Sequence, residues 1–115
     1  MKIVICGTGQ LEILELIDSI NKKANEEKFE LIGFLDDNLD NYSRNLYGYK
    51  ILGGFDWISN NKNDVFVVNS IARSTKIRLN ANLKLEKLGA KFVNLIHPSV
   101  QLSHSKSIGI GNIIF

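Results

Sequence analysis

Three short polar segments in this sequence of 115 residues follow aliphatic runs and carry groups that could bind a charged ligand. The first is Gly7-Thr8-Gly9-Gln10, which stands between a predicted strand and a predicted helix. Glycines in such a turn let backbone N–H groups approach a phosphate, and the N-terminus of the following helix favours its negative charge. A tight strand-to-helix turn without a ligand needs the same glycines, so both interpretations stay open.

The second and third segments carry side chains that could bind the rest of a nucleotide. Asp36 and Asp37 follow the run that ends at Leu35, where dinucleotide-binding folds place an acid on a ribose hydroxyl. Asn69 and Ser70 follow a third run. Open parallel sheets bind ligands beyond the carboxyl ends of their strands, so we expect the three segments to converge there. Because Asp and Asn are also common turn residues, capping of the local loops is the alternative.

A complete dinucleotide fingerprint has a third glycine, and Glu12 stands in its place. That glycine normally allows close packing of the helix on the strand, and a carboxylate near a pyrophosphate is repulsive. The pattern is therefore only a weak signal for NAD.

The remaining reactive side chains predict no catalytic or metal site. Cys6 ends a buried strand and is expected to be a small core residue. His97 is predicted as a turn or packing residue and His104 as an exposed residue of a hexad. Two isolated histidines without Cys or Glu at ligand spacing indicate no metal centre. Lys76 and Arg78 begin a helix near the expected site, where we interpret them as a solvated surface.

The elements that must position these groups alternate along the chain. Aliphatic runs predict buried strands at 2–6, 29–35, 65–68 and 91–95, with a short extra strand at 50–52 and a polar loop at 38–49. Helical spacing of apolar residues predicts one helix up to Ala24, a short helix or turn near Trp57, and one helix from Ser74 or Thr75. Alternation of this kind predicts an α/β fold with a parallel sheet and flanking helices.

The last of these helices has a predicted apolar face and a predicted end. Gly89 fits the left-handed position that follows a helix C-terminus. The inward-facing residues are expected to be Ile77, Ala81, Leu85 and Leu88.

The stretch from Ile96 to the end of the sequence changes to a period of six. Leu102, Ile108 and Ile114 fall six apart, and Ile96 lies in the same phase. A period of six belongs neither to helices nor to strands but to hexapeptide-repeat β-helices, in which each side of a triangular coil contributes one inward aliphatic residue. The three hexads that begin at Ile96, Leu102 and Ile108 predict about one coil.

Composition and charge exclude several classes of function. The net charge of +2 is weak and the lysines are mixed with acids, so we expect no nucleic-acid partner. The apolar run after Met1 is too short for a signal peptide, and no run reaches the ~18–20 residues of a membrane helix. A single cysteine fits a reducing cytoplasm. We therefore expect a cytoplasmic protein without a membrane partner.

Four strings of residues together resemble a known family. They are Lys2-Ile3-Val4-Ile5-Cys6-Gly7-Thr8-Gly9, Ile32-Gly33-Phe34-Leu35-Asp36-Asp37-Asn38, Gly48-Tyr49-Lys50-Ile51-Leu52-Gly53-Gly54 and Ile96-His97-Pro98-Ser99. In these strings the sequence resembles the sugar O- and N-acyltransferases of sialic-acid and bacillosamine pathways, which are bacterial enzymes of the left-handed β-helix superfamily. The resemblance covers the whole chain and divides it into a Rossmann-like domain at 1–95 and the start of a hexapeptide-repeat β-helix at 96–115.

The resemblance implies a function for each part. In that family the N-terminal domain binds the nucleotide of a sugar nucleotide, typically a UDP-linked amino sugar, for glycan biosynthesis. The β-helix forms a homotrimer, binds acetyl-CoA between subunits and supplies a histidine as general base. The substrate-binding residues implied by position are Gly7, Thr8, Gly9, Gln10, Asp36, Asp37, Asn69 and Ser70.

The resemblance also implies what this chain lacks. Neither His97 nor His104 matches the catalytic histidine, whose position would fall after Phe115. We therefore expect this chain to bind a sugar nucleotide, to bind no acetyl-CoA, and to be inactive alone. The alternative is a stand-alone regulatory module that binds NAD or another nucleotide, against which the missing third glycine argues.

Overall fold

The computed structural model describes residues 1–7, 12–24, 28–38, 45–46, 48–71, 75–99 and 113–114. Of these, 45–46 and 113–114 are described by their backbone alone. The predicted site residues Thr8, Gly9 and Gln10 lie outside the described residues, as do the hexad positions Leu102 and Ile108.

The centre of the fold is a five-stranded sheet in the order β3-β4-β2-β1-β5. It consists of β1 (Lys2–Cys6), β2 (Glu30–Leu35), β3 (Asn45–Leu46), β4 (Tyr49–Gly53) and β5 (Phe66–Asn69). All neighbouring pairs are parallel except β3 with β4, which is antiparallel. The predicted α/β fold with a parallel sheet is thereby confirmed.

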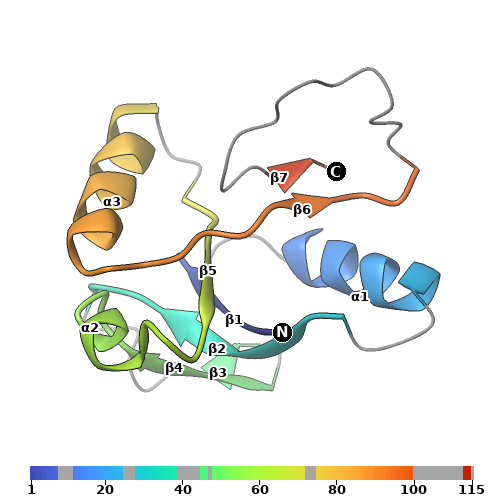
Figure 1. Cartoon of the computed structure of the whole chain (residues 1–115), viewed down its shortest axis with the longest axis horizontal. Helices are drawn as coiled ribbons and strands as arrows, with labels where there is room; N and C mark the ends of the chain where they lie inside the picture. Colours follow the sequence, from blue (N-terminus) through green and yellow to red (C-terminus); the bar gives the residue numbers. More distant parts are fainter. Residues whose placement is uncertain are drawn as a thin grey trace.

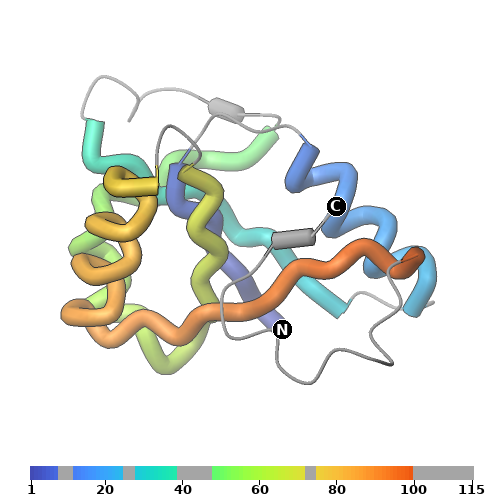
Figure 2. Tube along the Cα trace, turned by 90° about the horizontal axis from the view of Figure 1, so that it is seen from above, coloured from blue at the N-terminus to red at the C-terminus, as the bar shows by residue number. Residues whose placement is uncertain are grey.

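Helices cover both faces of this sheet (Figure 1). The helix α1 (Glu12–Ala24) lies on one face, and α2 (Trp57–Asn61) and α3 (Thr75–Lys87) lie on the other. The view from above shows α1 and α3 on opposite sides of the strands (Figure 2). In α1, acidic residues in the first turn and lysines in the last turn complement the helix dipole.

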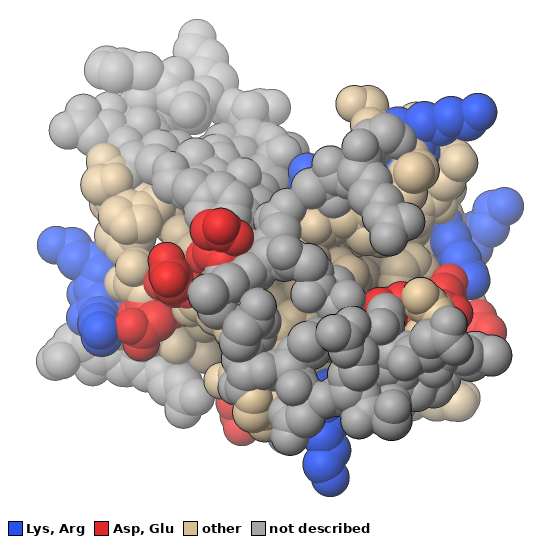
Figure 3. All heavy atoms as spheres, turned by 180° about the vertical axis from the view of Figure 1, so that it is seen from behind, with Lys and Arg blue, Asp and Glu red and all other residues tan. Residues whose placement is uncertain are grey.

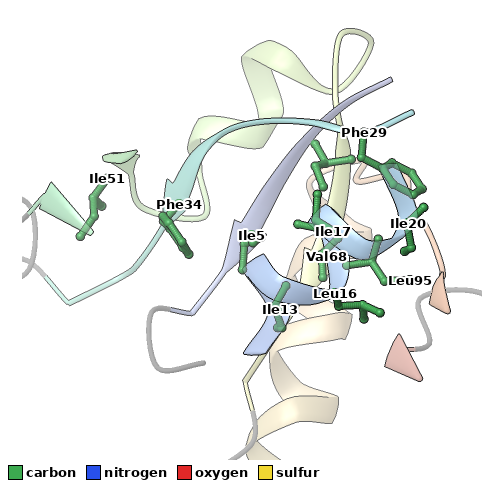
Figure 4. Packing of buried hydrophobic residues seen from close by; sticks show 11 residues of the cluster. Ile5, Ile13, Leu16, Ile17, Ile20, Phe29, Phe34, Ile51, Val68 and Leu95 are labelled. Atoms are coloured by element: carbon green, nitrogen blue, oxygen red, sulfur yellow. The ribbon is translucent and has the colours of Figure 1, made fainter. Parts of the chain in front are cut away.

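The two faces are separated by the alternation of side chains along β1. Ile3 and Ile5 point to the α1 face, whereas Val4 and Cys6 belong to the cluster on the α3 face. Figure 4 shows the α1 side chains packed between the sheet and Leu95, which is fully buried. Each face of the sheet therefore has its own apolar layer, and β1 contributes side chains to both layers.

Three expectations from the sequence differ from the structure. The loop predicted at 38–49 contains β3, a two-residue edge strand that pairs with the start of β4. The strand predicted at 91–95 is reduced to one bridge between Phe92 and Val67, because the chain leaves the sheet after two backbone hydrogen bonds. Ile77 is 45% exposed, since α3 is buried only from its second turn, at Ala81 and Leu85.

The other predicted features of α3 and its end are found. Leu88 is half-buried and packs against the same cluster as Leu85. Gly89 has a φ of 89°, which is the left-handed conformation expected after a helix C-terminus.

A second, two-stranded sheet lies beside α1. It pairs β6 (Leu95–Ile96) with β7 (Ile113–Ile114) in parallel, Leu95 opposite Ile113 and Ile96 opposite Ile114. Each residue thus pairs with the residue 18 positions later, which is the length of three hexads. Most of the path between the two strands, residues 100–112, lies outside the described residues, so the β-helix coil stays a prediction that this register supports.

Candidate functional site at the carboxyl edge of the sheet

The sheet brings the ends of three strands together. Cys6 at the end of β1 pairs with Leu35 at the end of β2 on one side and with Asn69 at the end of β5 on the other. Gly7 therefore lies at the centre of this edge, between the segments that begin at Asp36 and at Ser70. Because α1 follows β1 on one face and α3 follows β5 on the other, the gap between these strands is a topological switch point, where α/β sheets bind ligands.

Gly7, the first residue after β1, has a backbone conformation that suits glycine. Its φ is 93°, and its N–H donates to the carbonyl of Leu35 at 3.0 Å. A Cβ at this position would lie 3.1 Å from both Ile71 Cγ1 and Ser70 Oγ. The residue is therefore restricted by its backbone angle and by its neighbours together.

Ser70 links the end of β5 to the end of β1 by hydrogen bonds. Its hydroxyl donates to the carbonyl of Cys6 at 2.9 Å and lies 3.3 Å from the carbonyl of Gly7, and its N–H also donates to Cys6 at 2.9 Å. The side chain is 6% exposed. The hydroxyl proton thus serves the fold, and only the oxygen lone pairs of Ser70 are left for a ligand.

The side chain of Asn69 is hydrogen-bonded to α3. Its amide NH₂ donates to Asn82 Oδ1 at 2.8 Å and to the carbonyl of Arg78 at 3.3 Å, while its Oδ1 accepts the N–H of Ile71 at 3.0 Å. With 1% exposure, this side chain is part of the interior. Both amide donors and one acceptor position are therefore used within the protein.

Asp36 begins a loop that is held to β4. Its N–H donates to the carbonyl of Gly53 at 2.9 Å, and its Oδ1 accepts the N–H of Asn38 at 2.8 Å. The side chain is half-buried. This turn holds the Asp36 carboxylate at the end of β2, one residue after Leu35, whose carbonyl accepts the N–H of Gly7. The sequence predicts a contact with ribose at this strand end.

Asp37 joins three elements through its two carboxylate oxygens. Oδ1 accepts the N–H of Phe55, after β4, at 2.8 Å, and Oδ2 accepts a hydrogen bond from Lys84 Nζ of α3 at 2.7 Å. The same Nζ lies 5.5 Å from the centre of the Phe55 ring. Asp37 therefore connects the ends of β2 and β4 to α3.

The surroundings of Asp37 shift two pKa values in opposite senses. Burial alone would raise the pKa of the Asp37 carboxyl, but the hydrogen bonds from Lys84 and Phe55 and the ammonium charge outweigh it and lower that pKa. Burial raises the pKa of the Cys6 thiol far above its usual range, and the charge of Asp37 adds to this. Cys6 is therefore an inert core residue, as the sequence predicts.

Sequence reasoning missed Lys84, Asn82 and Phe55, which hold the candidate site together. No motif contains them. Lys84 and Asn82 lie in a helix with many charged and polar residues, a composition that is typical of a solvent-exposed surface. Asn82 lies in the second turn and Lys84 in the third turn of the helix that follows β5, so a search of that whole helix for polar residues would have found both.

The histidine predicted as a turn residue has that role. His97 Nδ1 accepts the N–H of Ser99 at 3.1 Å and lies 2.7 Å from Ser99 Oγ, in an exposed turn. His104 lies outside the described residues. Within the part of the chain that the structure describes, no group of three His, Cys, Asp or Glu residues could hold a metal ion.

Figure 3 shows how the charged side chains are distributed on one face of the molecule. On the face seen in Figure 3, basic side chains lie mostly towards the margins and acidic side chains between them. None of the helices in the described ranges has the length and apolar character needed to cross a membrane.

Comparison with solved structures shows where this fold occurs. The whole chain aligns with 51% of a mutant perosamine N-acetyltransferase from Caulobacter crescentus in complex with CoA and GDP-perosamine, at 22% identity and a TM-score of 0.73. Likewise, 97% of the chain aligns with 52% of the acetyltransferase domain of PglB from Neisseria gonorrhoeae, at 21% identity and a TM-score of 0.68. The latter domain is also known in complex with acetyl coenzyme A.

These likenesses establish the fold of the chain. It spans about half the length of each of these structures. No family model matches the sequence, and no curated protein matches it significantly.

Proposed function

We propose that this chain binds the nucleotide part of a nucleoside-diphosphate sugar and belongs to an acetyl-CoA-dependent sugar acetyltransferase. The observation that carries the proposal is the alignment of the whole chain with half of an acetyltransferase whose crystal holds GDP-perosamine. The convergence of Gly7, Asp36 and Ser70 at a topological switch point supports it independently.

The chemistry of the edge suits a nucleoside diphosphate. Backbone N–H groups of the segment that follows Gly7 would bind the diphosphate. Asp36 would accept a hydrogen bond from ribose or base, and the lone pairs of Ser70 would take a further donor. Thr8, Gly9 and Gln10 complete the proposed site on the strength of the resemblance alone.

Calorimetric titration tests this proposal. The chain is titrated with UDP, GDP, NAD and acetyl-CoA, since the resemblance implies UDP whereas the aligned perosamine enzyme was crystallised with GDP-perosamine. Binding of UDP or GDP more tightly than NAD is the expected result. Tighter binding of NAD would favour the stand-alone regulatory module, and binding of neither diphosphate would refute the proposal. The expected lack of acetyl-CoA binding is tested in the same series.

The substitution Asp36→Ala should weaken nucleotide binding by about 1.5–3 kcal/mol, because a charge-assisted hydrogen bond is lost. The matched control is Asp64→Ala, which removes an exposed carboxylate just before β5, at the opposite edge of the sheet. Affinity should be unchanged in the control. If Asp36→Ala binds as tightly as the unchanged chain with its fold intact, Asp36 is not part of the site.

A further inference from the structure

We propose that Asp37 and Lys84 are positioning residues of the nucleotide site, and that Asp37 acts through this pair without touching the ligand. This inference rests on the proposed function and reassigns the second of the two acids that the sequence marks as ligands. It also adds to the site a lysine that no motif identifies.

The first step concerns the hydrogen bonds that the two carboxylate oxygens of Asp37 accept. One accepts the N–H of Phe55 at 2.8 Å and the other accepts from Lys84 at 2.7 Å. Both oxygens can accept a further hydrogen bond, but the ammonium group of Lys84 already neutralises the charge of the carboxylate. Asp37 is therefore a weaker acceptor for a nucleotide hydroxyl than an acid without a cationic partner would be.

The second step concerns the parts of the site that the Asp37–Lys84 pair keeps in position. Asp37 directly follows Asp36, so fixing Asp37 against α3 and Phe55 fixes the turn that carries the Asp36 carboxylate. At the other side of the edge, the Asn69–Asn82 hydrogen bond of 2.8 Å joins α3 to the end of β5. The helix α3 is thus bonded to strand ends on both sides of Gly7, and Lys84 sets the position of one of them.

The third step separates positioning from stability. Lys84 and Asp37 have side chains that are 48% and 46% exposed, and exposed pairs of this kind contribute little to folding. Removal of either charge should therefore leave the fold intact while the turn at Asp36 loses its anchor. The effect of each variant on nucleotide binding should therefore exceed its effect on the free energy of unfolding.

The test is a double-mutant cycle on the binding of UDP or GDP, with Asp37→Asn, Lys84→Met and the double variant. Each single variant should lower affinity by roughly 2- to 10-fold, and the double variant should lower it no further than either. Lys84→Arg, which keeps a charged donor, should restore binding. The matched control is the exposed Asp18–Lys22 pair of α1, with N–O distance 2.9 Å, where Asp18→Asn and Lys22→Met should change nothing.

Other results overturn the inference. If Asp37 is a ligand, Asp37→Asn weakens binding strongly while Lys84→Met leaves it unchanged or strengthens it, because the carboxylate is released. If Lys84 only attracts the nucleotide by its charge, Lys84→Met weakens binding, Asp37→Asn strengthens it, and the two effects add. If the unchanged chain binds neither UDP nor GDP, the proposed function fails and this inference fails with it.

Discussion

Single residues at the carboxyl edge are constrained from more than one side. Gly7 combines a φ of 93° with neighbours that leave a Cβ only 3.1 Å from Ile71 and Ser70. Ser70 and Asn69 donate their side-chain hydrogen bonds within the protein, and the half-buried Asp36 carboxylate accepts the N–H of Asn38. The geometry at Gly7 and the charge on Asp37 each lead to a measurable expectation.

Gly7→Ala should lower the free energy of unfolding by more than Gly48→Ala. Both glycines have positive φ, so each alanine incurs a conformational cost of about 1–2 kcal/mol. Only at Gly7 does the new methyl group also meet other atoms, since nothing lies within 4 Å of a Cβ at Gly48. Chemical denaturation of both variants measures the difference. Equal costs would mean that the neighbours of Gly7 move away freely.

The Asp37 carboxyl should make stability depend on pH in the acid range. Its pKa is lowered in the folded state by Lys84 and Phe55, so its contribution is complete above the ordinary value of 3.8. That contribution is lost as the pH falls from 3.8 through the lowered folded-state pKa. The unfolding midpoints of the unchanged chain and of Asp37→Asn should therefore converge as the pH falls through this window. A gap that stays constant to the lowest pH would contradict the assignment.

At the scale of residues, the location of the candidate site could be predicted from the sequence, but its hydrogen bonds could not. Gly7, Asp36, Asp37, Asn69 and Ser70 were identified because strand ends in a parallel sheet meet at one edge. Their partners were not predictable, because the alignment of α3 over the edge is set by packing of Ala81 and Leu85 and not by any local pattern.

Among the elements, β2 and β4 leave no room for a side chain at Gly33. A Cβ on Gly33 of β2 would lie 2.7 Å from Leu52 Cγ and 2.8 Å from the carbonyl oxygen of Lys50, both in β4. The register between the two strands shifts between Phe34 and Leu35, close to this contact. The absence of a side chain at Gly33 is therefore what lets β4 take its place beside β2.

Gly33→Ala should destabilise the protein by about 1–3 kcal/mol through overpacking. In combination with Leu52→Ala, part of that cost should disappear, since the side-chain atoms nearest to the new methyl group are removed. The contact with the Lys50 carbonyl would remain, so full relief is not expected. Unfolding of the two single variants and the double variant by denaturant measures the coupling. Strict additivity would show that β4 moves away as a whole.

Elements were predictable where periodicity is strong and less so where tertiary contacts decide. β1 and α1 follow the apolar spacing of the sequence closely. The predicted strand at 91–95 has suitable residues, yet it makes only one bridge to Val67 because the chain turns towards α1. Ile77 has helical spacing with Ala81, but burial begins only at the second turn of α3.

At the scale of the whole molecule, Leu95 connects the parallel sheet to the segment with period six. It is fully buried in the cluster that contains Ile13, Leu16 and Ile20 of α1, and it is also the first residue of β6 (Figure 4). The sequence predicts a domain boundary at 95, and this side chain belongs to both sides of it. The two parts are therefore expected to unfold together.

Leu95→Ala should lower the free energy of unfolding by about 2–5 kcal/mol, which is the usual cost of a large-to-small change in a core. The control Leu83→Ala changes a side chain that is 48% exposed on α3 and should cost no more than about 0.5 kcal/mol. Denaturation followed both by circular dichroism and by amide exchange at β6 measures this. Loss of protection at β6 alone, with the sheet unaffected, would show that the two parts are independent.

The burial of Leu95 also sets an order of events during folding. β6 is held in place by the α/β core, so its backbone presents a fixed row of donors and acceptors before β7 arrives. β7 therefore pairs with a strand that is already ordered, and not with one that is itself unfolded. Loop closure costs grow only with the logarithm of loop length, so 18 residues add a modest barrier. Folding should proceed outward from the N-terminal sheet, which serves as the nucleus for the hexads that follow it.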